Sequence, residues 1–506
     1  MAGMVFLVGA GPGDQGLLTV RGADLLRRAD VVVYDRLVNP VLLDLYVRDE
    51  AERVYVGKAS DHHTMKQEEI NALLLAKALE GKVVVRLHGG DPVVFGRGGE
   101  EAASLAEAGI PFEVVPGITS AVAAPAYAGI PVTHRGYTSS FSVLTGHERA
   151  DGAESRVCWE KLATGAGTLV LLMGLANLQT IVDELLQHGR PLDTPVALIR
   201  WGSWPQQETI TGMLCDIAEK ARAVELQPPV VIVVGNVVDL RESLRWWDNR
   251  TLSGKRVLVT RTRHQASSLA SLLRDQGADP VEVPVLKIVP PESFDEIDRC
   301  ILRLGGYDWV AFTSGNGVGI FMSRVKALGL DARAFGKARL AAIGPATAEE
   351  LARHGLRADL VPEEYVAERL AEAMLARGMA GRRVLLPRAG EAREVLSDIL
   401  EECGAIVDRV VCYNTLPALE GADVLRRELA SGRIDAVTLA SSSTVEYLME
   451  MLGADAIALL DRAVIACIGP ITAATARKLG LRVDVEASEH TIPGLVKALV
   501  QHLKMH

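Results

Sequence analysis

Apolar segments of strand length alternate with amphipathic, helix-like segments along the first half of the chain. Residues 5–8 and 31–34 are predicted to be strands, and residues 18–28 between them a helix. This alternation is typical of a parallel α/β sheet. After a break in the pattern, further strands are predicted at residues 168–173, 195–199 and 230–234. The pattern therefore predicts two α/β lobes, at about residues 1–135 and 136–245.

A polar, turn-rich segment interrupts this pattern near the middle of the chain. Residues 241–255 lie between apolar strands predicted at residues 230–234 and 256–260. A segment of this composition between two periodic regions predicts a connection between domains. The predicted parts are a first domain, a linker and a second domain, at residues 1–245, 246–254 and 255–506.

The second half of the chain repeats itself. Residues 341–361 align without gaps onto residues 466–486, and ten of the 21 positions are identical. Two further pairs of blocks match in the same order, residues 307–314 with 434–441 and residues 256–261 with 383–388. Two copies indicate a tandem duplication into two α/β lobes with a binding cleft between them. The equivalent segments 283–291 and 410–417 are expected to cross between these lobes.

The composition excludes several classes of protein. The chain has 506 residues, 49% of them apolar, and no apolar run approaches the roughly 18 residues that span a bilayer. No secretory signal pattern opens the chain, so we expect a cytoplasmic protein without a membrane partner. The net charge of −10 argues against nucleic acid as a partner. The six cysteines are scattered, so neither a metal site nor a disulfide framework is expected.

A glycine-rich turn follows the first predicted strand. It reads Gly-Ala-Gly-Pro-Gly-Asp from Gly9 to Asp14, and a helix follows it. A dinucleotide-binding turn requires a small residue where Asp14 stands, because a carboxylate there repels the pyrophosphate. A cofactor without phosphate, such as the cationic sulfonium S-adenosylmethionine, suits an acidic turn. On this motif alone, a tight turn without a ligand is the alternative.

Two more strand-end turns are rich in small residues. The turn Gly89-Gly90-Asp91 ends one predicted strand, and the turn at residues 116–120 ends another. Glycines let a ligand approach the backbone, and Asp91 can accept hydrogen bonds from hydroxyl or amino groups. The three turns together predict one crevice at the carboxyl edge of a sheet, where open α/β folds bind ligands. Ordinary α/β turns without a ligand are the alternative.

Motifs through residues 4–247 resemble those of uroporphyrinogen-III C-methyltransferases. In chain order they are GAGPGDxxLLTxRG, VVYDRLV, VGK with QEEIN, GGDPxxFGRGGEE, VVPGITSA with AYAGIPxTHR, TLVLLMG and PPVVIVVGNVVDLR. The resemblance implies a two-lobed α/β methyltransferase, usually homodimeric, that binds S-adenosylmethionine between its lobes. The cofactor contacts that it implies are Pro12, Gly89, Gly90, Asp91, Val94, Thr119, Ser120, Met173 and Gly202. It also implies that Asp35 accepts a proton and that Lys58 donates one.

This sequence departs from the family pattern near three of these motifs. After Gly57 and Lys58 it reads Ala-Ser-Asp-His-His, where the family commonly has an arginine and a glycine. The family usually has lysine at the position of His88. Residues 199–205, which include Trp201 and Trp204, replace a small, polar stretch that ends in Gly-Thr. Gly202 is therefore the weakest match among the implied cofactor contacts. The two indoles could stack on a substrate or an adenine ring, and packing or an interface is the alternative.

Motifs across residues 254–500 resemble those of uroporphyrinogen-III synthase. They are FTSGNG at residues 312–317, AIGPAT at 342–347, VCYNT at 411–415, ASSST at 440–444 and CIGPIT at 467–472. The resemblance implies two lobes joined by a two-stranded ladder, with the first lobe discontinuous in sequence. This agrees with the crossings inferred from the repeat. The first lobe is expected at residues 255–284 plus 417–506, and the second at residues 289–411.

Polar groups in this second part are candidates for holding the acidic side chains of a tetrapyrrole. They belong to Arg261, Arg263, Thr313, Ser314, Asn316, Arg388, Ser441 and Ser442. Tyr413 matches the residue that the family offers for assisting departure of the substrate hydroxyl. A buried tyrosine in a crossing strand, without a chemical role, is the alternative.

The two resemblances together predict one bifunctional enzyme, because the synthase makes the substrate of the methyltransferase. The second part is expected to close hydroxymethylbilane with inversion of one ring. The first part is expected to methylate the resulting uroporphyrinogen III twice to precorrin-2, on the route to sirohaem or cobalamin. Two alternatives are a later corrinoid methylase fused to the synthase, and a methyltransferase joined to a non-catalytic two-lobed clamp that senses tetrapyrroles.

Overall fold

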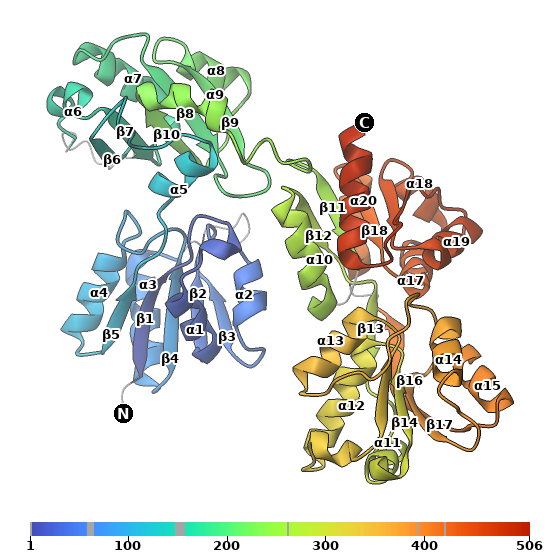
Figure 1. Ribbon diagram of the computed structural model, residues 1–506. Coiled ribbons are helices and arrows are strands. Elements are labelled where there is room, and N and C mark those ends of the chain that lie inside the picture. Colours follow the sequence, from blue (N-terminus) through green and yellow to red (C-terminus); the bar gives the residue numbers. More distant parts are fainter. Residues whose placement is uncertain are drawn as a thin grey trace. The chain divides into compact units, whose positions relative to one another are not determined.

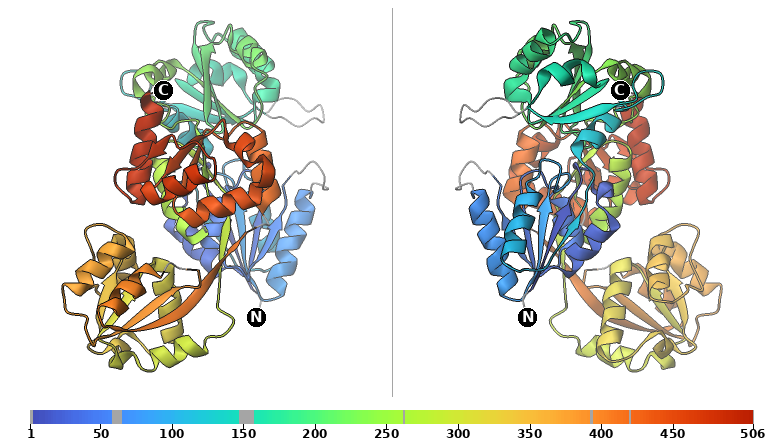
Figure 2. Two further views of the ribbon diagram at one scale, coloured as in Figure 1. Left: turned by 90° about the vertical axis from the view of Figure 1, so that its right-hand side faces the viewer. Right: turned by 90° about the vertical axis from the view of Figure 1, so that its left-hand side faces the viewer.

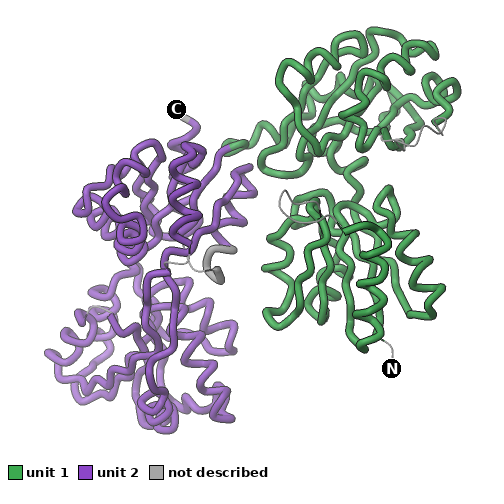
Figure 3. The backbone as a smooth tube through the Cα atoms, turned by 180° about the vertical axis from the view of Figure 1, so that it is seen from behind, with its two compact units in different colours: residues 1–254 green, residues 255–506 purple. Residues whose placement is uncertain are grey.

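The computed structural model describes residues 3–57, 65–146, 157–260, 263–391, 394–418 and 421–505. The chain forms two compact units, Met1–Gly254 and Lys255–His506 (Figure 3). Each unit contains two lobes, and each lobe is built on a five-stranded sheet. Among the described residues, no helix combines the length and the apolar character needed to cross a membrane.

The first lobe of the first unit is a parallel sheet with helices on both faces (Figures 1 and 2). Its strands, in spatial order, are β3 (Glu52–Tyr55), β2 (Val31–Tyr34), β4 (Val83–His88), β1 (Met4–Gly9) and β5 (Phe112–Val115). One face packs against α1 (Val20–Arg28) and α2 (Val41–Tyr46), and the other against α3 (Gln67–Leu79) and α4 (Gly98–Glu107). The central strands are apolar on both sides because both faces are covered. The predicted parallel α/β lobe is confirmed.

The second lobe of the first unit has a mixed sheet. Its strands, in order, are β6 (Phe141–Thr145), β7 (Thr168–Leu172), β10 (Val230–Val234), β8 (Pro195–Arg200) and β9 (Glu208–Met213). Strand β10 runs antiparallel to both of its neighbours. The helices of this part are α5 (Ser120–Tyr127), α6 (Trp159–Gly165), α7 (Leu178–Gln187), α8 (Ile217–Ala223) and α9 (Arg241–Leu244). The sequence predicts the three buried inner strands but not the edge strands β6 and β9, whose residues are mostly exposed or half-buried.

The first lobe of the second unit is assembled from both ends of that unit. Its parallel strands are, in order, β12 (Asp279–Glu282), β11 (Arg256–Val259), β18 (Ala436–Leu439), β19 (Val464–Cys467) and β20 (Val485–Glu486). Its helices are α10 (Arg263–Asp275), α16 (Ala422–Ala430), α17 (Ser442–Leu452), α18 (Ala456–Leu460), α19 (Pro470–Lys478) and α20 (Ile492–Met505). The expected discontinuity of this lobe is confirmed.

The second lobe of the second unit is continuous in sequence. Its sheet has the order β13 (Leu286–Val289), β17 (Ile406–Pro417), β16 (Arg383–Ala389), β14 (Trp309–Phe312) and β15 (Arg339–Ala342). Its helices are α11 (Asp295–Ile301), α12 (Gly315–Ala327), α13 (Pro345–Arg353), α14 (Ala367–Leu375) and α15 (Val395–Glu402). Strand β13 pairs antiparallel with the end of β17, from Asn414 to Pro417. This pair is the two-stranded ladder at the predicted crossings.

The sequence repeat corresponds to a repeat of elements in the second unit. Strands β16, β14 and β15 of one lobe match β11, β18 and β19 of the other in both order and parallel direction. Helices α12 and α13 match α17 and α19, and each of these four helices begins directly after a strand of the repeat. The duplication predicted from the sequence is confirmed.

The segment expected to be a linker packs against the first unit. The ring of Trp247 is 4.5 Å from that of Tyr127, and Trp247 is only 6% exposed. Asp248 forms an ion pair with Arg241, and Leu252 is fully buried. The boundary between the units lies after Gly254, because the residues before it are held by these contacts.

Candidate functional sites

A pocket of about 750 Å³ lies between the two lobes of the first unit. The strand-end turns of the first lobe supply part of its lining, and the loops after β7 and β8 of the second lobe supply another part. All of the residues proposed as cofactor contacts line it, namely Pro12, Gly89, Gly90, Asp91, Val94, Thr119, Ser120, Met173 and Gly202. Asp35 lines it as well. The structure therefore brings this whole set together at one site.

The three strand-end turns are locked to one another through their backbones. The amide of Gly11 donates to the carbonyl oxygen of Gly90 at 3.1 Å, and the amide of Gly90 donates to that of Gly11 at 2.7 Å. A Cβ atom on Gly9 would lie 2.5 Å from the Cα atom of Gly117, and one on Gly117 would overlap the carbonyl oxygen of Gly90. Only glycine permits so close an approach of two backbones. The crevice predicted from the sequence thus depends on glycine at these turns.

Asp91 organises these turns with its buried carboxylate. Its Oδ1 accepts hydrogen bonds from the amides of Val93 and Val94, at 2.8 and 3.0 Å. Its Oδ2 accepts one from the amide of Gly117 at 2.9 Å, which ties the second turn to the third. Asp91 is 6% exposed. It therefore shapes the pocket, whether or not it also accepts a bond from a ligand.

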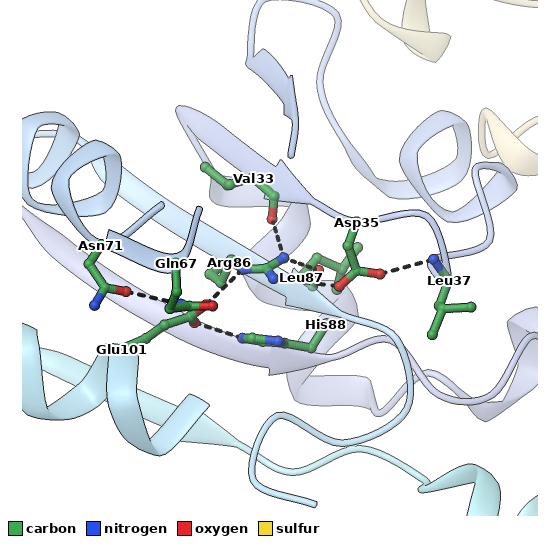
Figure 4. A network of polar contacts seen from close by, with 9 residues as sticks. All are labelled: Val33, Asp35, Leu37, Gln67, Asn71, Arg86, Leu87, His88 and Glu101. Atoms are coloured by element: carbon green, nitrogen blue, oxygen red, sulfur yellow. Dashed lines mark hydrogen bonds and ion pairs between the residues drawn. The ribbon is translucent and has the colours of Figure 1, made fainter. Parts of the chain in front are cut away.

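A buried polar network, drawn in Figure 4, reaches the wall of the pocket through Gln67, Arg86 and His88. Strand β4 supplies Arg86 and His88, which are two residues apart and therefore lie on one face of the sheet. Arg86 Nε donates to Glu101 Oε1 of α4 at 3.2 Å, and His88 Nε2 lies 2.8 Å from Oε2 of the same carboxylate. The amide of Gln67 in α3 also donates to Glu101, at 3.1 Å. Arg86, His88 and Glu101 are each no more than 5% exposed.

Glu101 is the negative centre of this network. Burial alone would raise the pKa of Glu101, but the hydrogen bond from His88 and the charges of His88 and Arg86 outweigh it, so the pKa lies below its usual value. An ionised carboxylate only accepts hydrogen bonds, so His88 Nε2 carries the proton in this contact. Glu101 thus holds the Arg86 guanidinium in place at the wall of the pocket, where the carboxylate balances its charge.

Asp35 lies where this network reaches the pocket. It follows β2, and its Oδ1 accepts a hydrogen bond from the amide of Leu37 at 2.9 Å. Its Oδ2 lies 3.5 Å from Arg86 Nη2, and its side chain is 26% exposed. The carboxylate is therefore accessible from the pocket with a guanidinium behind it. Lys58, the residue expected to act with Asp35, lies outside the described residues.

Four members of the network, Gln67, Arg86, His88 and Glu101, are not among the site residues proposed from the sequence. Arg86 interrupts an otherwise apolar strand from Val83 to Leu87, and a charged residue inside a buried strand signals a buried partner. The sequence does not identify that partner, because Glu101 is reached only through the packing of α4 on the sheet.

In the second unit, Tyr413 lies on β17 with its hydroxyl bonded to the Ser314 hydroxyl at 2.9 Å. Ser314 also caps α12 by accepting the amide of Gly317 at 3.0 Å. Tyr413 is 6% exposed. Burial raises the pKa of Tyr413, while hydrogen bonds with Ser314 and Asn316 oppose that rise. The structure thus brings these three candidate residues together at the N-terminus of α12, next to Thr313.

The other two serine candidates lie at the equivalent place in the duplicated lobe. Ser441 caps α17 by accepting the amide of Thr444 at 3.2 Å. Ser442 accepts a hydrogen bond from the Thr475 hydroxyl of α19 at 2.9 Å. The two groups of candidates therefore lie on different lobes of the same unit, each at the start of a helix that follows a strand.

Of the three arginine candidates in the second unit, the structure describes the side chain of one, Arg388. Arg388 is largely buried and forms an ion pair with Glu394 at 2.6 Å, so part of its charge is already matched within the protein. Arg261 lies outside the described residues, as does the side chain of Arg263. Within the described part of the chain, no group of three or more His, Cys, Asp or Glu side chains is placed to hold a metal ion.

Two family models match the chain, one for each unit. Residues 4–218 match the tetrapyrrole (corrin/porphyrin) methylases, and residues 267–497 match uroporphyrinogen-III synthase HemD. A solved structure with likeness to the first unit is a uroporphyrin-III C-methyl transferase from Thermus thermophilus complexed with S-adenyl homocysteine. It is 42% identical, covers 47% of this chain and 100% of its own, and has a TM-score of 0.41.

Of two similar proteins, one matches the first unit and the other nearly the whole chain. The uroporphyrinogen-III C-methyltransferase of Methanocaldococcus jannaschii is 54% identical over 244 residues, which are 48% of this chain and 100% of that protein. The porphyrin biosynthesis protein HemD of Ruminiclostridium josui is 39% identical over 500 residues, which are 99% of this chain and 98% of that protein. The chain therefore belongs to the family of this porphyrin biosynthesis protein, with a tetrapyrrole methylase as its first unit and a uroporphyrinogen-III synthase HemD domain as its second.

Proposed function

We propose that this chain is a bifunctional enzyme that makes uroporphyrinogen III and then methylates it. The second unit closes hydroxymethylbilane with inversion of one ring, and the first unit transfers two methyl groups to the product, giving precorrin-2. The fusion of a synthase domain to a methylase domain supports this order of reactions. One observation carries the proposal: every residue proposed as a cofactor contact lines the same pocket.

S-adenosylmethionine is the cofactor that we propose for this pocket. The lining fits it, because the backbone at Gly90 is open to a ligand, Thr119 and Ser120 offer hydroxyls, and Val94 and Met173 offer apolar surface. Bound there, the cofactor supplies an electrophilic methyl group. The protein holds the cofactor and the tetrapyrrole in line, and positioning of two reactants can supply about 7–11 kcal/mol of the barrier reduction.

Asp35 is the proposed proton acceptor of the methylation. Addition of a methyl group to a tetrapyrrole carbon leaves a positive charge that is relieved when the ring system loses a proton. The Asp35 carboxylate is accessible from the pocket and is held by the amide of Leu37, with Arg86 behind it. Lys58 is the proposed proton donor, on the basis of the family motif alone.

Tyr413 is the proposed proton donor of the cyclisation. Loss of the substrate hydroxyl needs a proton, and the Tyr413 hydroxyl, a hydrogen-bond donor buried beside Ser314, is proposed to supply it as the hydroxyl departs. The hydroxyl of Ser314 at 2.9 Å orients it. Thr313, Asn316, Ser441 and Ser442 are proposed to hold the acidic side chains of the substrate. Arg261 and Arg388 are proposed to assist them, Arg388 by exchanging its bond to Glu394.

The assembly and compartment of the protein are also proposals. We infer that the first unit forms a homodimer, because the methyltransferases that it resembles are usually dimeric, and that the enzyme acts in the cytoplasm. Light scattering of the purified full chain tests the dimer. A mass of one chain at micromolar concentration would contradict it.

Separate assays of the two activities on the full chain test the proposed function. With hydroxymethylbilane alone, we expect uroporphyrinogen III, recognised after oxidation as the inverted isomer. With preformed uroporphyrinogen III and methyl-labelled S-adenosylmethionine, we expect label in the tetrapyrrole. Binding of labelled cofactor without methyl transfer would contradict the assignment of the first unit as a methyltransferase. Formation of the non-inverted isomer would contradict the assignment of the second unit as a synthase and favour a non-catalytic clamp.

A further inference from the structure

Residues 201–204 of the second lobe form a loop that closes against the glycine-rich turn of the first lobe. The indole nitrogen of Trp204 donates to the carbonyl oxygen of Pro12 at 3.0 Å. The amide of Asp14 donates in the opposite direction, to the hydroxyl of Ser203 at 3.2 Å. These two bonds join the lobes at the rim of the pocket, next to a residue proposed to contact the cofactor.

The packing at this contact is as close as the backbone allows. A Cβ atom on Gly13 would overlap the indole ring of Trp204, and one on Gly202 would overlap Ala124 of α5. Glycine is therefore required in the turn, where it faces Trp204, and in the loop, where it faces α5. The loop and the turn fit each other closely, so their positions are not independent.

The backbone of the loop is strained. Trp201 has a φ angle of +47° and Ser203 one of +70°, in the left-handed region that residues with a side chain rarely adopt. Such conformations persist only where surrounding contacts impose them, and they gather at active sites and ligand clamps. Two of them on either side of Gly202 indicate that the loop is held in this shape for a function.

A chain of hydrogen bonds holds the loop from behind. The amide of Ser203 donates to Gln207 Oε1 at 2.9 Å, and Gln207 Nε2 donates to the carbonyl oxygen of Tyr127 at 3.2 Å. The hydroxyl of Tyr127 donates to Asp14 Oδ2 at 2.8 Å, which returns the chain to the glycine-rich turn. Loop, helix α5 and turn thus form one connected assembly across both lobes.

The two indoles of the loop line the pocket. Trp201 and Trp204 are edge to face, with ring centroids 5.2 Å apart, and both lie along the pocket wall with Pro12. Indole is the aromatic group that attracts cations most strongly and that stacks well on flat heterocycles. A sulfonium cofactor that carries a purine presents both a cation and a flat heterocycle.

We propose that Trp201 and Trp204 form a clamp for S-adenosylmethionine. Trp204 holds the glycine-rich turn in its binding position, and Trp201 contacts the cofactor with its ring. This inference rests on the proposed methyltransferase function. It assigns the affinity for the cofactor to an aromatic pair at a position where the family pattern has small, polar residues.

Calorimetry with S-adenosylhomocysteine on the full chain tests the part played by Trp204. Trp204→Phe keeps a ring but removes the hydrogen bond to Pro12, so we expect the Kd to rise roughly threefold to tenfold. Trp159→Phe is the matched control, because Trp159 packs on the core of the same lobe and is not among the pocket residues. Equal Kd values in the two variants would overturn the role of Trp204.

Two substitutions test Trp201. Trp201→Gly suits the positive φ angle, so we expect the melting temperature to hold within a few degrees while the Kd rises at least tenfold. Trp201→Phe, which keeps a ring, should bind S-adenosylhomocysteine more tightly than Trp201→Gly. If Trp201→Phe binds no more tightly than Trp201→Gly, or if Trp201→Gly binds as tightly as Trp159→Phe, Trp201 is not part of the clamp. Failure of the wild type to bind would instead contradict the proposed function, and the clamp with it.

Discussion

At the scale of single residues, Glu101 organises a pocket that it does not line. It binds Arg86, His88 and Gln67, and through Arg86 it reaches Asp35. Asp35 could be proposed from the sequence, because it follows an apolar strand within a family motif. The pair of Arg86 and Glu101 could not, since it depends on how α4 packs against β4. Sequence patterns thus identify an accessible candidate residue more readily than its buried support.

Replacement of Glu101 should destabilise the first unit strongly. In Glu101→Ala, Arg86 would be left buried without its partner, which typically costs about 3–5 kcal/mol. The measurement is urea unfolding of the full chain. The transition of the first unit is recognised as the one that S-adenosylhomocysteine shifts. Glu100→Ala is the control, because Glu100 forms its ion pair with Arg97 at the exposed surface. A loss no larger than that of the control would show that the network does not stabilise the fold.

The same carboxylate should make the first unit sensitive to acid. Because the pKa of Glu101 lies below its usual value of 4.5 in the folded protein, its contribution to stability is fully present above that value. The contribution is lost as the pH falls through the folded pKa. We therefore expect the difference in melting temperature between wild type and Glu101→Gln to shrink below pH 4.5. A difference that stays constant from pH 7 to pH 3.5 would contradict this assignment.

Tyr413→Phe should separate chemistry from packing in the second unit. The variant keeps the buried ring but loses the hydroxyl, and loss of a donor that acts in the transition state costs roughly 10²–10³ in rate. We expect the cyclisation rate to fall by that factor, with methylation of supplied uroporphyrinogen III unchanged. Tyr307→Phe is the control, since Tyr307 belongs to the same core but bonds Asp408. An unaltered cyclisation rate in Tyr413→Phe would remove this hydroxyl from the mechanism.

At the scale of elements, the strand-end turns could be predicted because their signal is local. Each of the three turns has a glycine within two residues of the end of its apolar strand, which is β1, β4 or β5. The internal repeat likewise predicts matching strands in the two lobes of the second unit. Strands β6 and β9 have no such signal, since they lie at sheet edges and lack a continuous buried run. Their position is set by pairing with an inner strand rather than by their own sequence.

Gly117→Ala should disrupt the turns as a group. A Cβ atom there would overlap the carbonyl oxygen of Gly90, so the second and third turns must separate. We expect S-adenosylhomocysteine binding to weaken by at least tenfold, with a stability loss of about 1–3 kcal/mol from overpacking. Gly99→Ala is the matched control, because a Cβ atom at Gly99 would meet nothing within 4 Å. Calorimetry that finds the two variants equal would contradict the close packing of these turns.

At the scale of the whole molecule, the chain is two units that each contain their own cores. The structure divides the chain after Gly254, at the end of the segment predicted to be a linker, and the sequence does not show that Trp247 packs on Tyr127. Tryptophans in a polar, turn-rich segment are compatible with an exposed connection, and only the tertiary structure reveals their partner. The boundary between the two compact units therefore follows Gly254 rather than residue 245.

Fragments divided at this boundary should keep their separate activities. Residues 1–254 and 255–506, produced separately, should each unfold cooperatively and retain methylation and cyclisation respectively. A shorter fragment of residues 1–245 lacks Trp247, which is buried in the full chain. Removal of a buried aromatic side chain typically lowers the free energy of unfolding by about 3–5 kcal/mol. We therefore expect a lower melting temperature for the shorter fragment. If the two first-unit fragments were equally stable, the segment after residue 245 would be a true linker.

A single reaction tests the bifunctional assignment most directly. The full chain is incubated with hydroxymethylbilane and S-adenosylmethionine, and the products are followed by absorbance and identified by mass. We expect precorrin-2, a tetrapyrrole of the inverted isomer carrying two added methyl groups, with uroporphyrinogen III alone when the methyl donor is omitted. Accumulation of the non-inverted isomer, or of unmethylated uroporphyrinogen III in the presence of the methyl donor, would contradict the assignment.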